Sequence, residues 1–170
     1  MSHFNYRYVT MTHSINQRTA NCLPYATNTD LQFQEKLNLV AKTKISICYN
    51  IVHVTPTHQQ AIQSYPRWNE NAAFASLGKW NIIPQFKTRM HEAAISKTLN
   101  LVQRDPWNIA EGYYTPEKEF IYFDNEIDLH TKITEILGDW EAYDTIIQRA
   151  YNTAMNYTTD KFIERIKNDT

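Results

Sequence analysis

The run ISICYNIVHV at residues 45–54 constrains the fold more than any other segment of this 170-residue chain. It is almost continuously apolar and rich in β-branched residues, and Pro56 follows it closely. A half-exposed strand alternates apolar and polar residues, whereas a continuous apolar run is typical of a strand buried on both faces of a parallel sheet. Parallel neighbours are joined by crossover connections that are usually helical. The run therefore predicts an α/β fold.

Strand and helix patterns alternate along the rest of the chain. The pattern predicts strands over residues 2–12, 45–54, 98–104 and 119–123. It predicts helices over residues 31–44, 71–78, 86–97 and 126–137, a further helix from residue 139 and a short final helix around 162–166. We therefore expect residues 1–170 to form a single Rossmann-like domain, with a parallel sheet, helices on both of its faces and a helical C-terminus.

The helix predicted after residue 125 has the clearest ends. Asn125 is a favoured N-cap, and Gly138 stands where glycine commonly closes a helix. Between them Leu129, Ile133, Ile136 and Leu137 fall on one apolar stripe. This spacing predicts a helix that packs one side against the sheet.

The charge balance and the cysteines argue against several classes of protein. Lys and Arg number 17 against 18 Asp and Glu, and the sequence pI is about 6.6, so we expect neither a nucleic-acid-binding face nor a polybasic lipid-binding face. No apolar run approaches the roughly 18 residues of a membrane span, and the N-terminus lacks the layout of a secretory signal. Cys22 and Cys48 form no CxxC motif, which excludes a thiolate zinc site. We therefore expect a reduced, cytoplasmic protein.

The three glycines, Gly78, Gly112 and Gly138, are too few and too far apart for a glycine-rich phosphate loop. The segment 84–116 offers another way to hold phosphates. Lys87 and Arg89 stand near the start of a predicted helix, where side-chain cations and backbone N–H groups together suit a diphosphate.

Glu92, one turn beyond Arg89, could accept hydrogen bonds from two ribose hydroxyls, or could instead form a solvated surface pair with Arg89. His91 and Glu92 begin like a zinc-binding HExxH helix, but Ile95 stands where the second histidine would be, so we expect no metal there.

Four stretches in order resemble the C-terminal, nucleotide-sugar-binding domain of GT-B glycosyltransferases, of the group-1 type related to spore-maturation proteins. They are PQFKTRMHEAA, TLNLVQRDPWNIAEGYYTPEKEFIYFDN, DLHTKITEIL and AYNTAMNYTTDKFIERI. The likeness covers roughly residues 80–166. It implies one half of a GT-B architecture, which binds a donor such as a UDP- or GDP-sugar and needs no metal or other cofactor.

The resemblance also implies a role for each matched residue. Glu92 matches the glutamate that holds the donor ribose, and Arg89, with Lys87, faces the diphosphate, so Arg89 and Glu92 would be the catalytic residues. The loop that approaches the donor sugar and phosphates matches Asn108, Ile109, Ala110 and Glu111. Arg18 matches a basic residue of the opening loop.

A complete enzyme of this architecture has two such domains. We therefore expect the acceptor-binding half in a further domain or a second chain, and an exposed face that a homodimer could bury. The alternative is a non-catalytic α/β interaction module. The surplus of aromatic residues, among 11 Tyr, 7 Phe and 4 Trp, would then provide an aromatic surface that recognises a protein or a glycan.

Overall fold

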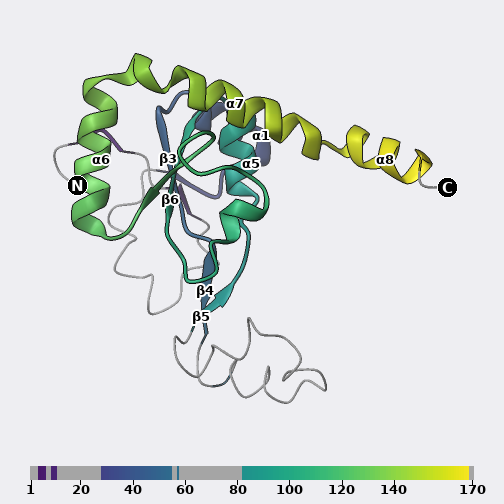
Figure 1. The fold of residues 1–170 in the computed structure, drawn as a ribbon, viewed down its shortest axis with the longest axis horizontal. Coiled ribbons are helices and arrows are strands. Elements are labelled where there is room, and N and C mark those ends of the chain that lie inside the picture. The colour runs from purple at the N-terminus through teal and green to yellow at the C-terminus, as the bar shows by residue number, and fades with distance from the viewer. Residues whose placement is uncertain (1–3, 7–8, 11–27, 55–56, 58–81, 169–170) are drawn as a thin grey trace. The chain divides into compact units, whose positions relative to one another are not determined.

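The structure is a computed structural model that describes residues 4–6, 9–10, 28–54, 57 and 82–168 (Figure 1). The chain divides into two compact units, Met1–Leu39 and Val40–Thr170. In the first unit, strands β1 (Val9–Thr10) and β2 (Asn28–Thr29) pair in parallel. Residues 4–6 of the strand predicted over 2–12 are not in a strand, and the remainder of that prediction, apart from β1, lies outside the described residues.

Helix α1 (Phe33–Val40) is shorter than the helix predicted over residues 31–44. Thr43 accounts for its end. Both the backbone N–H of Thr43 and its hydroxyl donate to the Val40 carbonyl oxygen, at 2.9 and 2.7 Å. These bonds form a turn that stops the helix four residues before the predicted boundary.

The second unit contains a three-stranded parallel sheet. Its strands are β3 (Ile45–Cys48), β6 (Leu99–Gln103) and β7 (Ile121–Phe123), in the order β3-β6-β7. The register pairs Ile45 with Leu99 and Leu101 with Ile121. The predicted α/β class with a parallel sheet is thus confirmed.

Helices cover both faces of this sheet (Figure 1). Helix α5 (Arg89–Ile95) lies on one side, and α6 (Glu126–Gly138) lies on the other. The core on the α5 side consists of Cys48, Met90, Ala94, Val102, Ala110, Tyr114, Phe120, Tyr122, Ala150 and Ala154. The core on the α6 side consists of Leu99, Leu101, Ile121, Phe123, Leu129, Ile136 and Ile147. Successive residues of β6 and β7 alternate between the two cores, as a pleated strand requires.

The strand predicted over residues 45–54 is divided in two. β3 stops at Cys48, and after Tyr49 and Asn50 the chain forms β4 (Ile51–His53), which pairs antiparallel with β5 (Ile82–Pro84). The prediction of burial on both faces was wrong for this segment. In the described sheet β3 stands at one end of the strand order, so its residues 45–47 are only half-buried, and the fully covered strand is the central β6.

The helix predicted over residues 86–97 begins later, at Arg89, and the helix predicted over 71–78 lies outside the described residues. The helix after Asn125 is confirmed as α6, because the Asn125 side-chain oxygen accepts N–H bonds from Ile127 and Asp128, both at 3.0 Å. The C-terminal elements are η5 (Trp140–Tyr143), α7 (Asp144–Ala154), η6 (Met155–Tyr157) and α8 (Thr159–Asn168). None of the helices in the described ranges has the length and apolar character to cross a membrane.

Candidate functional site

A buried amide positions the chain just before α5. Asn50 has no exposed surface, and its Oδ1 accepts the backbone N–H of Lys87 at 3.0 Å. The Asn50 carbonyl oxygen accepts the N–H of Gln85 at 2.9 Å, and its Nδ2 donates to the sulfur of Met90 at 3.2 Å. Asn50 follows β3, so these contacts hold residues 85–90 at the carboxyl end of a parallel strand. Ligands of open α/β sheets bind at this edge.

Two cations stand together on this segment. Lys87 is half-buried and Arg89 is exposed. Burial lowers the pKa of Lys87, and the neighbouring charge of Arg89 lowers it further. The Lys87 ammonium donates to the neutral side chain of Gln85, and neither cation forms an ion pair with any residue that the structure describes. Two close positive charges that pair with no carboxylate among the described residues make this surface attractive to an anion.

Glu92 follows Arg89 by one turn of α5 and is half-buried. The Cys48 thiol lies at the end of β3, and its burial raises the pKa of the thiol to about 11. The charge of Arg89 lowers this pKa and the charge of Glu92 raises it, but both effects are smaller than that of burial. The surface ion pair between Arg89 and Glu92 that the sequence left open is not formed in the described part of the chain. The buried Cys48 thiol stays protonated at neutral pH and is therefore no nucleophile.

The loop after β6 is held by a buried carboxylate. Asp105 is 5% exposed and accepts backbone N–H bonds from Trp107 at 2.9 Å and from Ile109 at 3.3 Å. Burial raises the pKa of Asp105, while these backbone bonds act in the opposite direction. Asp105 thus fixes the path of residues 105–109.

The residues that the resemblance matched in this loop have different environments. Asn108 is exposed and adopts a left-handed backbone with φ 50°, a conformation that asparagine tolerates. In the short helix η4 (Ile109–Gly112), Ala110 is buried in the core. Glu111 is exposed and accepts the Tyr122 hydroxyl at 3.3 Å. The exposed Asn108 and Glu111 are therefore the members of the set best able to reach a ligand.

Aromatic side chains join this loop to α5. The His91 Nδ1 and the Tyr114 hydroxyl are hydrogen-bonded at 2.6 Å, and burial lowers the pKa of His91. Phe86 stacks on Tyr113 with ring centroids 3.9 Å apart, and His91 stacks on Tyr157 at 4.7 Å. We call these five residues the aromatic cluster. Its members come from three separate segments of the sequence, residues 86–91, 113–114 and 157, so no local pattern could have revealed it.

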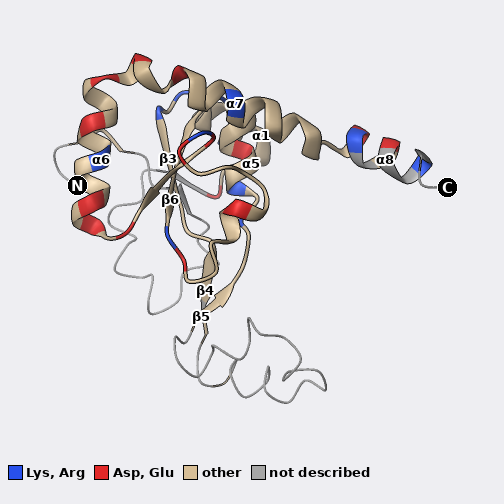
Figure 2. Cartoon of the chain, viewed as in Figure 1, with Lys and Arg blue, Asp and Glu red and all other residues tan. Residues whose placement is uncertain are grey.

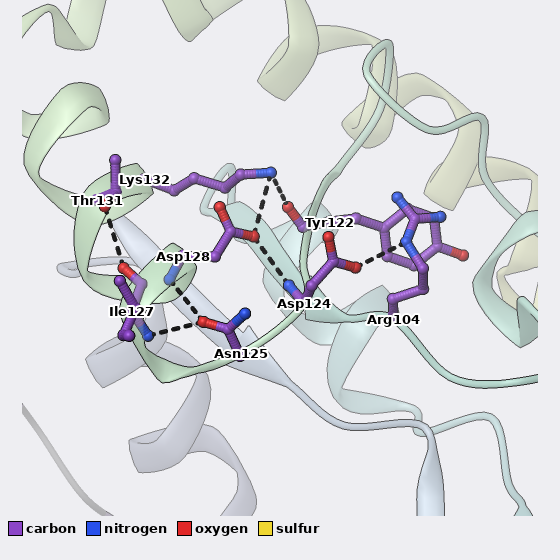
Figure 3. Close-up of polar contacts among 8 residues, drawn as sticks. All are labelled: Arg104, Tyr122, Asp124, Asn125, Ile127, Asp128, Thr131 and Lys132. Carbon is purple, nitrogen blue, oxygen red and sulfur yellow. Dashed lines mark hydrogen bonds and ion pairs between the residues drawn. The ribbon is translucent and has the colours of Figure 1, made fainter.

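A second polar network lies where β6 and β7 end (Figure 3). The Arg104 guanidinium lies 4.1 Å from the Tyr122 ring centroid, and its Nε donates to Asp124 at 2.9 Å. The Lys132 ammonium donates to the Tyr122 carbonyl oxygen at 2.5 Å and lies 3.6 Å from Asp128. Each cation in this network has a carboxylate partner. This edge is therefore less suited to an added anion than the start of α5.

The distribution of charged residues also differs between α6 and the start of α5 (Figure 2). Acidic residues predominate along α6 (Figure 2). In the sequence, by contrast, Lys87 lies just before α5 and Arg89 is its first residue. Lys87, Arg89 and Glu92 lie in one short stretch of the sequence. The aromatic cluster joins this stretch to Tyr113 and Tyr114, which directly follow η4. Arg18 lies outside the described residues. Within the described ranges, no three His, Cys, Asp or Glu side chains gather as metal ligands.

Comparisons of the chain with protein-family models, with curated proteins and with solved structures found no match.

Proposed function

We propose that this chain binds a nucleoside-diphosphate sugar at the start of α5 and serves as the donor-binding domain of a metal-independent glycosyltransferase. The observation that carries the proposal is the pair of cations, Lys87 and Arg89. They lie close together at the carboxyl end of a parallel strand, with no carboxylate partner in the described part of the chain. A diphosphate supplies the missing negative charge.

The proposed chemistry is mainly electrostatic. As the bond from the anomeric carbon to the diphosphate breaks and a bond to the acceptor oxygen forms, negative charge develops on the leaving diphosphate. Arg89 and Lys87 would stabilise that charge, and the fixed backbone at Lys87 means that little rearrangement is needed. Glu92 would hold the donor ribose, and Asn108 and Glu111 would approach the sugar. A base in the acceptor-binding half would take the acceptor proton.

Calorimetric titration tests the site directly. The purified chain is titrated with UDP, GDP, TDP and their sugar conjugates, without added metal. Arg89→Ala and Glu92→Ala should each weaken binding tenfold or more, since losing a hydrogen bond to a charged group costs about 1.5–3 kcal/mol. The matched controls Arg149→Ala and Glu141→Ala change exposed residues of α7 and η5 and should leave the affinity unchanged.

Two results would contradict the proposal in different ways. If a nucleotide binds but both α5 variants keep the wild-type affinity, the ligand lies elsewhere on the chain. If a folded wild-type chain binds no nucleotide, the donor-binding function is wrong. The alternative of an interaction module with an aromatic surface would then be favoured.

A further inference from the structure

The hydrogen bond between Tyr114 and His91 fixes where the imidazole carries its proton. Tyr114 is 3% exposed, and burial raises the pKa of its hydroxyl, which therefore keeps its proton at neutral pH. In the described part of the chain this hydroxyl reaches one acceptor, the His91 Nδ1 at 2.6 Å. A buried hydroxyl that does not donate leaves its proton unsatisfied, so Tyr114 donates to Nδ1. His91 is then neutral and carries its own proton on Nε2.

A second proton on His91 is incompatible with this arrangement. An imidazolium ion donates from both nitrogens, so Nδ1 can no longer accept. The hydroxyl proton of Tyr114 must then turn away from Nδ1, and no second acceptor for it is within reach among the described residues. Because Tyr114 is buried, that proton stays without a partner. The packed cluster therefore holds the neutral form of His91 better than the charged form.

The surroundings of His91 do not offset this preference with a neighbouring charge. Its ring neighbours are the uncharged side chains Phe86, Tyr113, Tyr114 and Tyr157. Charged side chains on the elements around it include Arg89 and Glu92 of α5, Glu119 near the Tyr114 hydroxyl, and Arg149 of α7. None of them shifts the pKa of His91, which burial lowers.

His91 in turn holds the segment that joins α7 to α8. Within this segment η6 carries Tyr157, whose ring stacks on the imidazole with centroids 4.7 Å apart. Tyr157 also meets Tyr113 edge to face, at 5.9 Å. The next residue, Thr158, has an extended backbone (φ −74°, ψ 157°), and its hydroxyl accepts a backbone N–H of α8 at 3.4 Å. The helix is thus interrupted and begins again after Thr158, and such a break can serve as a hinge.

Tyr157 is the member of the cluster that can leave most easily. It is 42% exposed and lies on a three-residue helix beside the hinge, whereas Tyr114 belongs to the core and Phe86 packs against it. Local opening of such a segment costs less than unfolding the domain. An imidazolium ion still attracts the face of Tyr157, but this attraction is weak at a partly exposed ring. Turning the imidazole out of its place relieves the stranded hydroxyl proton and ends the stack on Tyr157.

We propose that His91 is a pH-sensitive switch: protonation breaks its hydrogen bond with Tyr114, turns the imidazole and releases Tyr157, so that η6 and the start of α8 detach from the aromatic cluster. This regulation goes beyond the proposed function and does not depend on it, because no step involves a ligand. The switch links one proton on α5 to the position of a segment more than 60 residues further along the chain.

Hydrogen exchange at the backbone amides of residues 152–168 tests the switch. Protection factors, which correct for the pH dependence of intrinsic exchange, are compared at about pH 7.5 and pH 5.5. In the wild type they should fall severalfold, with an upper limit of about tenfold, because pH 5.5 is about one unit below the ordinary pKa that His91 regains in the open segment. Protection of α6, on the other side of the sheet, should change less.

Three variants assign the effect to its residues. His91→Phe keeps a ring for Tyr157 to stack on but cannot take up a proton, so the fall should disappear. His130→Gln, which removes an exposed histidine of α6, is the matched control and should behave as the wild type does. Tyr157→Leu should show low protection of the segment already at pH 7.5, because the stack on His91 is absent.

Constant protection in the wild type would overturn the switch, and so would an equal fall in His91→Phe. A fall of the same size in α6 would show that the whole domain loosens, which also overturns a local release. Tyr157→Leu supplies a check that needs no change at His91. If this variant keeps wild-type protection at pH 7.5, Tyr157 does not hold η6 and the inference is wrong.

Discussion

Replacing Asn50 by alanine should destabilise the protein strongly, because this one side chain holds the segment that leads into α5. Its Oδ1 is the acceptor for the Lys87 N–H at 3.0 Å, and its Nδ2 reaches the sulfur of Met90 at 3.2 Å. The bond from Gln85 to the Asn50 carbonyl oxygen is a backbone bond and survives the substitution. The change therefore removes a single strong hydrogen bond and leaves one part-buried donor without a partner.

The size of the effect follows from these two losses. The hydrogen bond contributes about 1 kcal/mol net, and a buried donor left unsatisfied costs about 1–3 kcal/mol. The lower part of that range applies, since the Lys87 N–H is only part-buried. Losing the contact to the Met90 sulfur adds little, because a thioether is a weak acceptor. We expect the free energy of unfolding to fall by about 2–3 kcal/mol.

Urea unfolding followed by circular dichroism measures this change. With a slope of about 2 kcal/mol per molar urea, the midpoint of Asn50→Ala should fall by about 1 M or slightly more. The matched control is Asn152→Ala, which removes an exposed amide on α7 that accepts from Gln148 at 3.0 Å and should change stability by less than about 0.5 kcal/mol. Equal midpoints for Asn50→Ala and the wild type would refute the reasoning, because the Asn50 side chain would then contribute nothing to holding the segment.

Three further predictions concern stability and accessibility. Asn125→Ala should lower the free energy of unfolding by about 1 kcal/mol through loss of the α6 cap, whereas Asn125→Asp should not; equal urea midpoints for the two variants would contradict this. Burial lowers the pKa of His91 below its ordinary 6.5, so the unfolded chain takes up a proton there before the folded chain does, and stability should fall as the pH drops below about 6.5. His91→Gln should show a smaller fall between about pH 7.5 and 5.5, and an identical fall would exclude this role for His91. In a Cys22→Ser chain, the buried Cys48, whose pKa is about 11, should react with Ellman's reagent much more slowly when native than in urea, and equal rates would disprove its burial.

The fold class was predictable because it depends on local sequence patterns. The apolar runs that became β3, β6 and β7 mark strands, and Asn125 marks the start of α6 through contacts within four residues of it. The division of residues 45–54 was not predictable, because it depends on tertiary contacts. Asn50 interrupts the run by bonding to residues 85–90, and β4 then pairs with a three-residue strand that ends in proline.

The candidate site was predictable only in part, for the same reason. The cations and Glu92 lie within six residues of one another, so sequence spacing alone places Lys87, Arg89 and Glu92 on one stretch. The roles of Asn50 and of the aromatic cluster depend on contacts between residues tens of positions apart. Sequence spacing carries no signal for such contacts.

Alternate residues of β6 belong to two different cores, and this separation affects how the protein can evolve by substitution. The segments of the candidate site, α5 and η4, pack into the core on the α5 side, and Leu101 and Ile136 pack on the other. Stabilising substitutions usually conflict with activity when they rigidify the binding residues themselves. The core on the α6 side lies on the opposite face of the sheet from these segments, so its packing can be improved without changing them. Substitutions that improve packing there should raise the unfolding midpoint and leave the residues of the candidate site unchanged, so stability and the chemistry of that site can be selected independently.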